Sequence, residues 1–305
     1  MNYLKVSFKN KNIIITGASE GLGFEIAKRF IENNANLIIC SSNYKKIKSA
    51  FYRLNKDLKY YQKIYFYKID LSQEKEVYKF VKFTKNKFKK IDCLINNAAM
   101  LGPMGKLEDL DWKKFKKTIQ VNFLSPALII KLLLPIFKKQ KKGKIIQIAG
   151  GGSSSPSILR NPYAASKAGI VRLVENISEE LKLLKLNVQI NSVSPGVMNT
   201  KMFKKIIIKG KKILGNKMIR ELNKKNNNKT DYNKIVELIF FLSSNFSKEI
   251  TGKNISANWD NWKIWNNNIN KIKKSDLYTI RRIVGSDRKF IKGDVVNKNR
   301  KKIWT

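Results

Sequence analysis

The feature that most constrains the fold is a regular alternation of short apolar runs and amphipathic runs. The apolar runs are continuous, which is typical of strands buried on both faces of a parallel sheet. Six are predicted as strands: Asn12–Thr16, Asn36–Cys40, Ile64–Ile69, Cys93–Asn96, Lys144–Ala149 and Val188–Ser194. The intervening runs predict helices near Gly23–Asn33, Tyr44–Asp57, Gln73–Phe88, Trp112–Phe137 and Tyr163–Leu186. This alternation predicts an α/β protein with a doubly wound parallel sheet.

The last third of the chain has a weaker pattern. Residues 201–230 are rich in lysine and asparagine, and their weak helical signal fits either a substrate lid or a solvated loop; a helix is predicted at Tyr232–Leu242. We expect one domain over residues 1–257 and an extension over 258–305 that packs on it. Four aromatic side chains are expected to dock the extension rather than wall a pocket: Trp259, Trp262, Trp265 and Tyr278.

The formal charge of +41 arises from 63 basic and 22 acidic residues, and 54 of the basic residues are lysine. Readers of bases and phosphates favour the arginine fork, so this lysine excess indicates compositional drift and not a specific nucleic-acid partner. The charge still predicts attraction to polyanions at low salt, so a basic protein that binds polyanions is one alternative function.

The chain has two cysteines, Cys40 and Cys93, and no histidine. This composition predicts neither a disulfide framework nor a metal site. The N-terminus lacks the apolar core of a signal peptide. The run Phe123–Phe137 is interrupted by Pro126, Lys131 and Pro135, so we expect no membrane span. These features predict a cytoplasmic protein with reduced thiols.

A glycine-rich turn, TGASEGLG at residues 16–23, joins the first predicted strand to the first helix. Glycine permits a tight turn and a close approach of backbone N–H groups to a pyrophosphate, which the helix N-terminus then faces. The position between a strand and a helix is the context that favours a dinucleotide site over an ordinary turn.

Tyr163 and Lys167 are four residues apart on a predicted helix, so they share one face. A nearby ammonium lowers the pKa of a phenol, and we expect it to enable general acid–base chemistry without histidine. An ordinary helix start after Asn161-Pro162 would also explain this stretch.

Six motifs in order resemble the short-chain dehydrogenase/reductase family over roughly residues 9–257. They are TGASEGLG (16–23), Asp70 in IDLS, NNAA (96–99), Asn122 in QVNF, YAASK (163–167) and SPGVMNT (194–200). The resemblance implies a Rossmann-type fold and an NAD(P)-dependent oxidoreductase acting on an alcohol or carbonyl compound. A Gly-rich loop after the fifth strand and a C-terminal extension resemble a subgroup of the family, whose members we associate with surface-polysaccharide or nucleotide-sugar genes.

The resemblance also implies site residues. The cofactor phosphates and ribose would be lined by Gly17, Ser19, Gly21, Leu22 and Gly23. The resemblance places Asp70 at the adenine, Asn96 beside the adenosine ribose, and Pro195, Gly196 and Thr200 at the nicotinamide. Tyr163 would protonate the substrate oxygen, Lys167 would hold the nicotinamide ribose, and Asn122 would hold a water in the proton relay.

The end of the second strand bears on the choice between NAD and NADP. No carboxylate stands near Ser41 to bind a ribose 2′-hydroxyl, as an NAD enzyme would usually require. Ser41 and Ser42, with Lys45 and Lys46 beyond, favour NADP, although Glu20 and the lack of arginine there leave NAD open.

The serine that the family places thirteen residues before the tyrosine is missing. Gly150 stands there, beside Ala149, and the first hydroxyl is that of Ser153. Either the loop lets Ser153 or Ser154 reach the substrate oxygen, or the site lacks a hydrogen bond worth about 10²–10³ in rate. A cofactor-binding scaffold without catalysis is therefore one alternative, and a 3-oxoacyl thioester reductase is another. The resemblance also implies a homodimer or homotetramer formed through the helices near 112–137 and 163–186.

Overall fold

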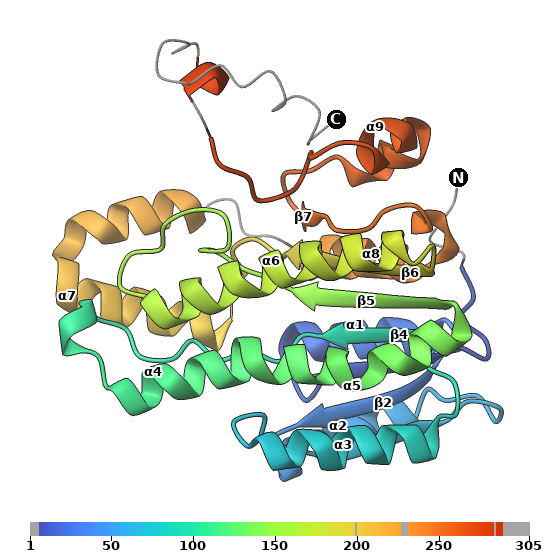
Figure 1. The fold of residues 1–305 in the computed structure, drawn as a ribbon. Helices are drawn as coiled ribbons and strands as arrows, with labels where there is room; N and C mark the ends of the chain where they lie inside the picture. Colours follow the sequence, from blue (N-terminus) through green and yellow to red (C-terminus); the bar gives the residue numbers. More distant parts are fainter. Residues whose placement is uncertain (1–5, 199, 227–230, 284, 289–305) are drawn as a thin grey trace.

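The computed structural model describes residues 6–198, 200–226, 231–283 and 285–288. At its centre lies one parallel sheet of seven strands in the order β3-β2-β1-β4-β5-β6-β7 (Figure 1). The strands are β1 (Asn12–Thr16), β2 (Asn36–Ser41), β3 (Ile64–Lys68), β4 (Cys93–Asn96), β5 (Lys142–Ile148), β6 (Asn187–Ser194) and β7 (Asn254–Ser256). The predicted α/β class and parallel sheet are confirmed.

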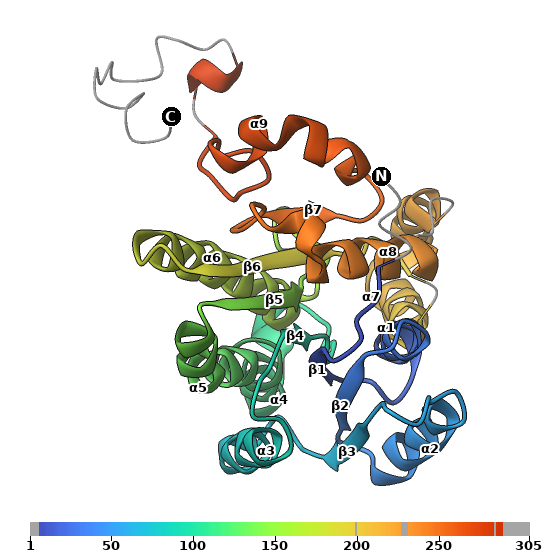
Figure 2. The same ribbon diagram turned by 90° about the vertical axis from the view of Figure 1, so that its right-hand side faces the viewer.

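Helices cover both faces of the sheet, with α3 to α6 on one side and α1, α2 and α8 on the other (Figure 2). The α-helices are α1 (Gly21–Glu32), α2 (Tyr44–Asn55), α3 (Glu74–Lys87), α4 (Trp112–Ile119), α5 (Ser125–Gln140), α6 (Asn161–Leu183), α7 (Lys201–Asn226), α8 (Tyr232–Ser243) and α9 (Ile269–Lys273). Side chains alternate between the faces within each strand. In β1, Ile13 and Ile15 join the core under α1 and α8, whereas Ile14 joins the core under α3 and α5.

The helix expected at Trp112–Phe137 is present and runs without a break from Trp112 to Gln140, through a π-helical turn at Gln120–Leu124, so the prolines that interrupt its apolar run do not divide it. Pro126 is the second residue of α5, just after the π-helical turn, and Pro135 is accommodated inside α5. By length and composition alone this helix could cross a membrane. Its inner face instead packs on the sheet, with Ile129, Leu133 and Phe137 fully buried. We therefore interpret it as a core helix of the sandwich.

Residues 201–226 form a helix, α7, where the sequence had shown only a weak helical signal. The backbone departs from helical geometry at Gly215, which has φ +68° and ψ −167°, so α7 is two helical pieces joined at a kink. Buried apolar contacts of its first piece explain the order, because Ile206 packs against Leu101 and Met104. The many lysines in this segment weaken the helical pattern of apolar residues, so the sequence did not predict the buried face of α7.

The chain beyond β7 packs along the edge of the sheet. Trp262 and Trp265 are buried in the core beneath α8, whereas Trp259 is 71% exposed. The Tyr278 ring packs on Trp265 with ring centroids 4.4 Å apart and planes tilted by 36°, and the Tyr278 carbonyl accepts a hydrogen bond from the Asn254 N–H of β7. These contacts cover the edge strand, which would otherwise expose unpaired backbone groups. Residues 289–305 lie outside the described part of the chain.

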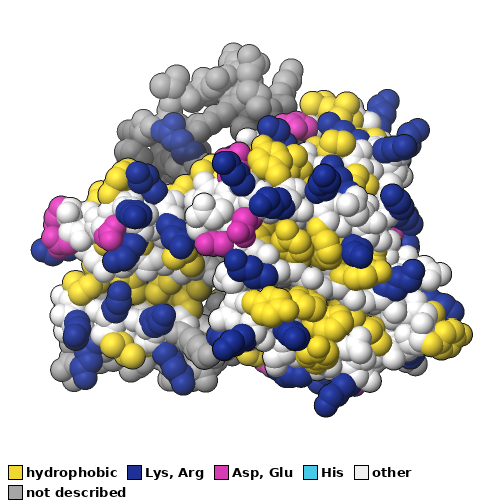
Figure 3. Space-filling model, turned by 90° about the horizontal axis from the view of Figure 1, so that it is seen from below, with side chains coloured by type: hydrophobic (Ala, Val, Ile, Leu, Met, Phe, Trp, Pro, Cys, Tyr) yellow, Lys and Arg dark blue, Asp and Glu magenta, His cyan; other side chains and the backbone are white. Residues whose placement is uncertain are grey.

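The basic side chains are spread over the surface. The face seen from below shows lysine and arginine scattered among apolar and acidic side chains rather than gathered into one stripe (Figure 3). A nucleic-acid groove usually concentrates its positive charge along the path of the backbone. On this face the distribution agrees with the compositional interpretation of the +41 charge.

Candidate active site

The glycine-rich turn between β1 and α1 is held in a narrow conformation. Gly17 and Gly21 have φ values of +67° and +59°, which favour glycine. A Cβ at Gly17 would lie 2.7 Å from the Cα of Ala98, and one at Gly23 would overlap the carbonyl oxygen of Gly17. The turn therefore depends on glycine, both for its dihedral angles and for its close contact with the chain after β4.

A pocket of about 720 Å³ opens over this turn at the carboxyl ends of the strands. Most of the predicted cofactor residues line it: Gly17, Ser19, Gly21, Leu22, Ser41, Ser42, Asp70, Tyr163, Lys167, Pro195 and Thr200. Gly23, Asn96 and Gly196 are not among the lining residues. The location matches the place where parallel α/β sheets bind ligands, and the pocket is large enough for a dinucleotide.

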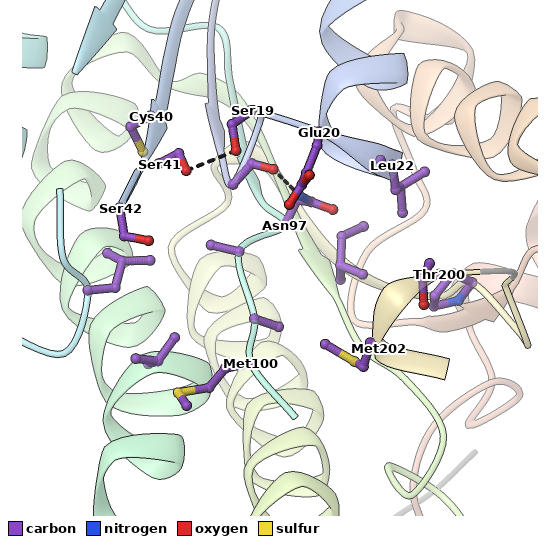
Figure 4. Close-up of a pocket in the computed structure, with 18 of the residues that line it drawn as sticks. Ser19, Glu20, Leu22, Cys40, Ser41, Ser42, Asn97, Met100, Thr200 and Met202 are labelled. Atoms are coloured by element: carbon purple, nitrogen blue, oxygen red, sulfur yellow. Dashed lines mark hydrogen bonds between the residues drawn. The ribbon is translucent and has the colours of Figure 1, made fainter. Parts of the chain in front are cut away.

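In the NNAA segment the second asparagine, Asn97, lines the pocket, together with Ala98 and Ala99. The Asn97 amide donates to the carbonyls of Thr16 and Gly17 at 3.1 and 3.0 Å, so it ties β4 to the glycine turn (Figure 4). Asn96, which we expected beside the adenosine ribose, is buried within the sheet, and its side-chain amide has no hydrogen-bond partner among the described residues. Both are asparagines at a strand end, so composition alone did not distinguish them.

The end of β2 faces the turn. The hydroxyls of Ser19 and Ser41 lie 2.9 Å apart, and Ser42 follows at the pocket rim (Figure 4). Lys46 pairs with Glu20 at 2.9 Å, and both side chains are about half exposed. The lysine thus partly neutralises the carboxylate that the sequence placed at the phosphate site.

Asp70, which follows β3, also lines the pocket. Burial raises its pKa, but hydrogen bonds from Ser72 and the charges of Lys117 and Lys68 outweigh that effect, so the pKa lies below its ordinary value. The Ser72 N–H donates to the carboxylate at 2.9 Å. Asp70 is therefore an ionised acceptor, as the recognition of an adenine amino group requires.

Tyr163 and Lys167 lie on the first turns of α6 and both line the pocket. The Lys167 ammonium donates to the carbonyl of Ile148 at 2.7 Å and lies 5.7 Å from the centroid of the Tyr163 ring. This hydrogen bond directs the lysine along the end of β5. The spacing predicted one shared face, and the structure has it.

The expected effect of Lys167 on the Tyr163 pKa is not found. Burial raises the pKa of Tyr163, and the opposing charge comes from Arg160. Burial also lowers the pKa of Lys167 itself to about 8, because the ammonium is fully desolvated. Burial thus disfavours the charged form of both groups, contrary to what their spacing suggested.

The loop after β5 brings Gly150 against the tyrosine. A Cβ at Gly150 would lie 2.5 Å from the Tyr163 hydroxyl oxygen, so the space of the missing serine side chain is taken by that hydroxyl. Ser153 is buried, its N–H donates to the Gly150 carbonyl, and its side chain is not among those that line the pocket. The structure therefore does not bring Ser153 together with the other candidate catalytic residues at the pocket wall.

Asn122 lies in η3 (Gln120–Leu124), a single π-helical turn between α4 and α5. Its amide bonds the backbone of Met100 twice, at 2.9 Å each, and donates to Ser166 at 3.2 Å. A π-turn inside a helix is frequent at functional sites because it redirects a side chain. Here it turns Asn122 toward α6 and the segment after β4, behind the pocket wall.

The end of the pocket around Tyr163, called the substrate end below, is apolar. Tyr163 packs in a small cluster with Leu101, Met104, Ile206 and Met202, the last two from α7. Met100, Met198 and Met202 also line the pocket. Met198 lies within the SPGVMNT motif, whereas no sequence motif singled out Met100 or Met202. Their selection depends on which side chains the loops after β4 and β6 turn inward, which only tertiary packing decides.

Both cysteines are free and buried in the sheet, where burial raises the pKa of each thiol to about 12. Within the described residues no group of three or more metal-ligating side chains lies together.

Residues 11–210 match the short chain dehydrogenase family, so the chain belongs to this family of oxidoreductases that bind NAD or NADP. The chain is 26% identical over 199 residues to the L-fucose dehydrogenase of Oryctolagus cuniculus, an alignment that covers 65% of this chain and 66% of that protein. It is 28% identical over 257 residues to the Short-chain dehydrogenase reductase 3c of Arabidopsis thaliana, covering 82% and 93%. The chain thus spans slightly less than two thirds of the rabbit relative.

Solved structures share the fold. NAD+-bound xylitol dehydrogenase superposes with a TM-score of 0.72 at 23% identity over 82% of this chain and 98% of that one. An actinorhodin polyketide ketoreductase with NADPH gives 0.72 at 19% identity over 81% and 95%. At such identities the likeness concerns the fold, and the two structures carry different nicotinamide cofactors.

Proposed function

We propose that the protein is an NAD(P)-dependent oxidoreductase that interconverts an alcohol and a carbonyl compound. The observation that carries this proposal is one continuous pocket that runs from the glycine turn to Tyr163 and Lys167. The glycines fit a dinucleotide because a Cβ at Gly17 or Gly23 would close the turn on which a pyrophosphate rests. A bound nicotinamide supplies or takes up the hydride.

The chain's own residues supply the proton chemistry. Tyr163 donates its phenolic proton to the carbonyl oxygen during reduction and accepts it during oxidation. Lys167, whose ammonium donates to the Ile148 carbonyl at the end of β5, would hold the nicotinamide ribose. Asn122 is proposed to hold the water of the proton relay, as the family resemblance implies. Its amide is bonded to Met100 and Ser166 behind the pocket wall, so this role requires a water to reach it from the pocket.

For the cofactor we propose NADP, with NAD as the alternative. The support is the pair of hydroxyls at Ser41 and Ser42 and the absence of a carboxylate among the residues of β2 that line the pocket. A 2′-phosphate finds donors there, with Lys45 and Lys46 near by in the sequence.

For the substrate we propose a sugar-related alcohol or its carbonyl form. The names of two similar proteins, L-fucose dehydrogenase and xylitol dehydrogenase, support this class. A 3-oxoacyl thioester is the alternative substrate, and a cofactor-binding scaffold without turnover is the alternative function. The scaffold is favoured by one observation, the glycine at position 150 where the orienting serine is missing.

Ser153 is the remaining candidate for that orienting donor. It does not line the pocket, so the role requires the loop Gly150–Gly152 to move. The Ser153→Ala variant decides the point. A fall of about 10²–10³ in kcat with an unchanged cofactor Kd assigns the serine to the substrate oxygen. A change below about threefold removes Ser153 from the mechanism.

We further propose a single reductase domain over residues 1–257 with the extension 258–305 packed on it, a cytoplasmic location, and a homodimer or homotetramer. We place the subunit contact on the helices near 112–137 and 163–186, as the family resemblance implies. Sedimentation at several concentrations measures the assembly.

The experiment that tests the function follows NADPH and NADH oxidation with a panel of ketones, keto-sugars and 3-oxoacyl thioesters. The wild type is compared with Tyr163→Phe, which keeps the ring but loses the proton. We expect turnover of at least one carbonyl class and a loss of about 10²–10⁴ in kcat in the variant, with the cofactor Kd unchanged. Equal rates in both proteins would eliminate Tyr163 as the acid, and no turnover with tight cofactor binding would support the scaffold.

A further inference from the structure

Large apolar side chains are exposed around the substrate end of the pocket. The loop after β4, the loop after β5 and the start of α7 each contribute to the pocket lining, through Met100, Ala149 and Met202. These segments lie at one end of the molecule, on the left of Figure 1. Together with the start of α4, they carry four apolar side chains that are each more than half exposed, here called the apolar rim: Leu107, Trp112, Ile158 and Ile208.

Direct contacts hold the segments of the apolar rim together. The Gly105 N–H donates to the Leu159 carbonyl at 3.1 Å, which joins the loop after β4 to the loop after β5. Ile206 of α7 packs against Leu101 and Met104 of the first loop. In each of the three segments the exposed apolar residue stands one or two positions from such a contact. The exposed side chains therefore belong to one surface beside the pocket.

Trp112 extends this surface along the start of α4. The helix lies against the loop after β4, because a Cβ at Gly102 would overlap the Thr118 hydroxyl. The indole stacks on Phe115 with ring centroids 4.7 Å apart, which orients it although it is 62% exposed. Tryptophan combines a large apolar surface with one N–H donor and is enriched where hydrocarbon meets water.

The segments that carry the apolar rim are also positively charged. Residues 201–213, in the first piece of α7, contain six lysines and no acidic residue, and residues 106–117 contain five lysines against three acidic residues. Ile208 is exposed between Lys204 and Lys212, which lie one turn before and after it on the same helix face. Exposed apolar residues flanked by lysine are typical of a helix that lies on an anionic bilayer.

The charge favours a bilayer over a second copy of the chain as the partner of this surface. A twofold contact sets the same patch against itself, so two lysine-rich segments would meet and repel each other. A bilayer that contains anionic lipids offers negative headgroups to the lysines and an apolar layer to the exposed side chains.

We propose that the apolar rim docks the protein on the surface of a membrane that contains anionic phospholipids, with the substrate end of the pocket next to the lipid headgroups. The association is peripheral, because it uses side chains of loops and of two surface helices. It goes beyond the proposed oxidoreductase function and does not depend on turnover.

Tryptophan quenching tests which part of the surface enters the bilayer. Vesicles of equal parts phosphatidylglycerol and phosphatidylcholine, with brominated acyl chains, are added at about 0.3 M salt, which screens exposed charges. We expect the wild type to bind and to lose part of its tryptophan fluorescence. Trp112→Phe should abolish most of this quenching. Trp259→Phe is the matched control, because Trp259 is 71% exposed beyond β7 and its loss should leave the quenching unchanged.

Vesicle affinity separates apolar docking from attraction by charge alone. The double variant Trp112→Ser with Ile208→Ser keeps every lysine, and we expect it to bind the same vesicles about tenfold or more weakly than the wild type. Tyr60→Ser is the control, since Tyr60 is fully exposed in the connection before β3, at the opposite edge of the sheet, and should bind as the wild type does. Far-UV circular dichroism checks that each variant is folded.

Three results would overturn the docking surface. The first is a wild type that does not bind the vesicles at this salt concentration, and the second is a double variant that binds as tightly as the wild type, which would leave only charge. The third is a double variant that dissociates an oligomer in sedimentation, which would assign the surface to a second copy of the chain. NADPH binding is measured separately, so each of these results leaves the oxidoreductase proposal standing.

Discussion

The two ends of the pocket are built differently. At the cofactor end, backbone turns and hydrogen bonds fix the geometry, since Asn97 holds Thr16 and Gly17 while Ser19 meets Ser41. At the substrate end, Tyr163 is enclosed by apolar side chains from α7 and the loop after β4, and the position of the usual serine is a glycine. The first end is organised before a ligand arrives, whereas the second depends on side chains that can repack.

The largest expected effect breaks the cofactor end. Gly17→Ala forces a side chain into a φ of +67° with its Cβ 2.7 Å from Ala98. We expect the Kd of NADPH to rise by about 100-fold or more, because the turn can no longer follow the pyrophosphate. Gly151→Ala is the matched control, since nothing lies within 4 Å of its Cβ position and it should bind as wild type. An equal loss of NADPH affinity in both variants would show that the geometry of the glycine turn does not determine cofactor binding.

The second prediction concerns selectivity at the same end. Ser41→Asp places a carboxylate where a 2′-phosphate is proposed to bind and where a 2′-hydroxyl could be accepted instead. We expect the NADPH affinity to fall by about 10–100-fold and the NADH affinity to stay level or rise. Titration of both cofactors measures the ratio. An unchanged ratio would contradict the assignment of Ser41 to the 2′ position.

The third prediction addresses the substrate end. Gly150→Ala puts a methyl group 2.5 Å from the present position of the Tyr163 hydroxyl, so the ring must shift. We expect kcat to fall by about tenfold with an unchanged cofactor Kd, because misplacing a reacting group by a fraction of an ångström reduces the rate. A higher kcat in this variant, or in Gly150→Ser, would indicate that the hydroxyl moves away from Gly150 when substrate binds.

The smallest expected effect is a pH dependence of stability. Burial lowers the pKa of Lys167 to about 8 from 10.5, so the unfolded chain binds more protons between these values. Below pH 8 the folded protein holds a buried, charged Lys167, which lowers the free energy of unfolding. This cost is relieved as the pH rises from about 8 to 10.5, so the folded state becomes more stable with increasing pH. Lys144 and Lys253 contribute in the same direction, whereas the buried thiols oppose it above about pH 9.

Urea unfolding at pH 7, 8 and 9 measures this trend. We expect the free energy of unfolding to rise by about 1–3 kcal/mol and Lys167→Met to flatten part of the rise. A stability that falls steadily over this interval would show that Lys167 is solvated or paired in the folded state.

The glycine turn and the pair Tyr163 and Lys167 could be located from the sequence because their features are local. The spacing along the chain predicts the geometry in both cases: glycines between a strand and a helix form a tight turn, and a tyrosine and a lysine four residues apart share one face of a helix. The strands β1 and β4 were located to the residue, since continuous apolar runs bounded by turns are distinctive. Asn96 and Asn97 could not be separated in this way, because which of the two faces the pocket depends on the twist at the strand end.

The substrate end could not be predicted to the same depth. The order of α7 comes from a few apolar contacts in a lysine-rich segment, and the lining by Met100 and Met202 comes from loop conformation. The electrostatics also required the structure. Burial raises the pKa of Tyr163, and the charge that opposes this effect is that of Arg160, which no motif contained.

The measurement that tests the central claim most directly is a fluorescence titration of the purified protein with NADPH and, separately, NADH at salt high enough to suppress nonspecific anion binding. The account predicts saturable binding with a stoichiometry of one per chain, tighter for NADPH, and weakened about 100-fold or more by Gly17→Ala but unchanged by Gly151→Ala. No saturable binding of either cofactor would contradict it, whatever the arrangement of Tyr163 and Lys167.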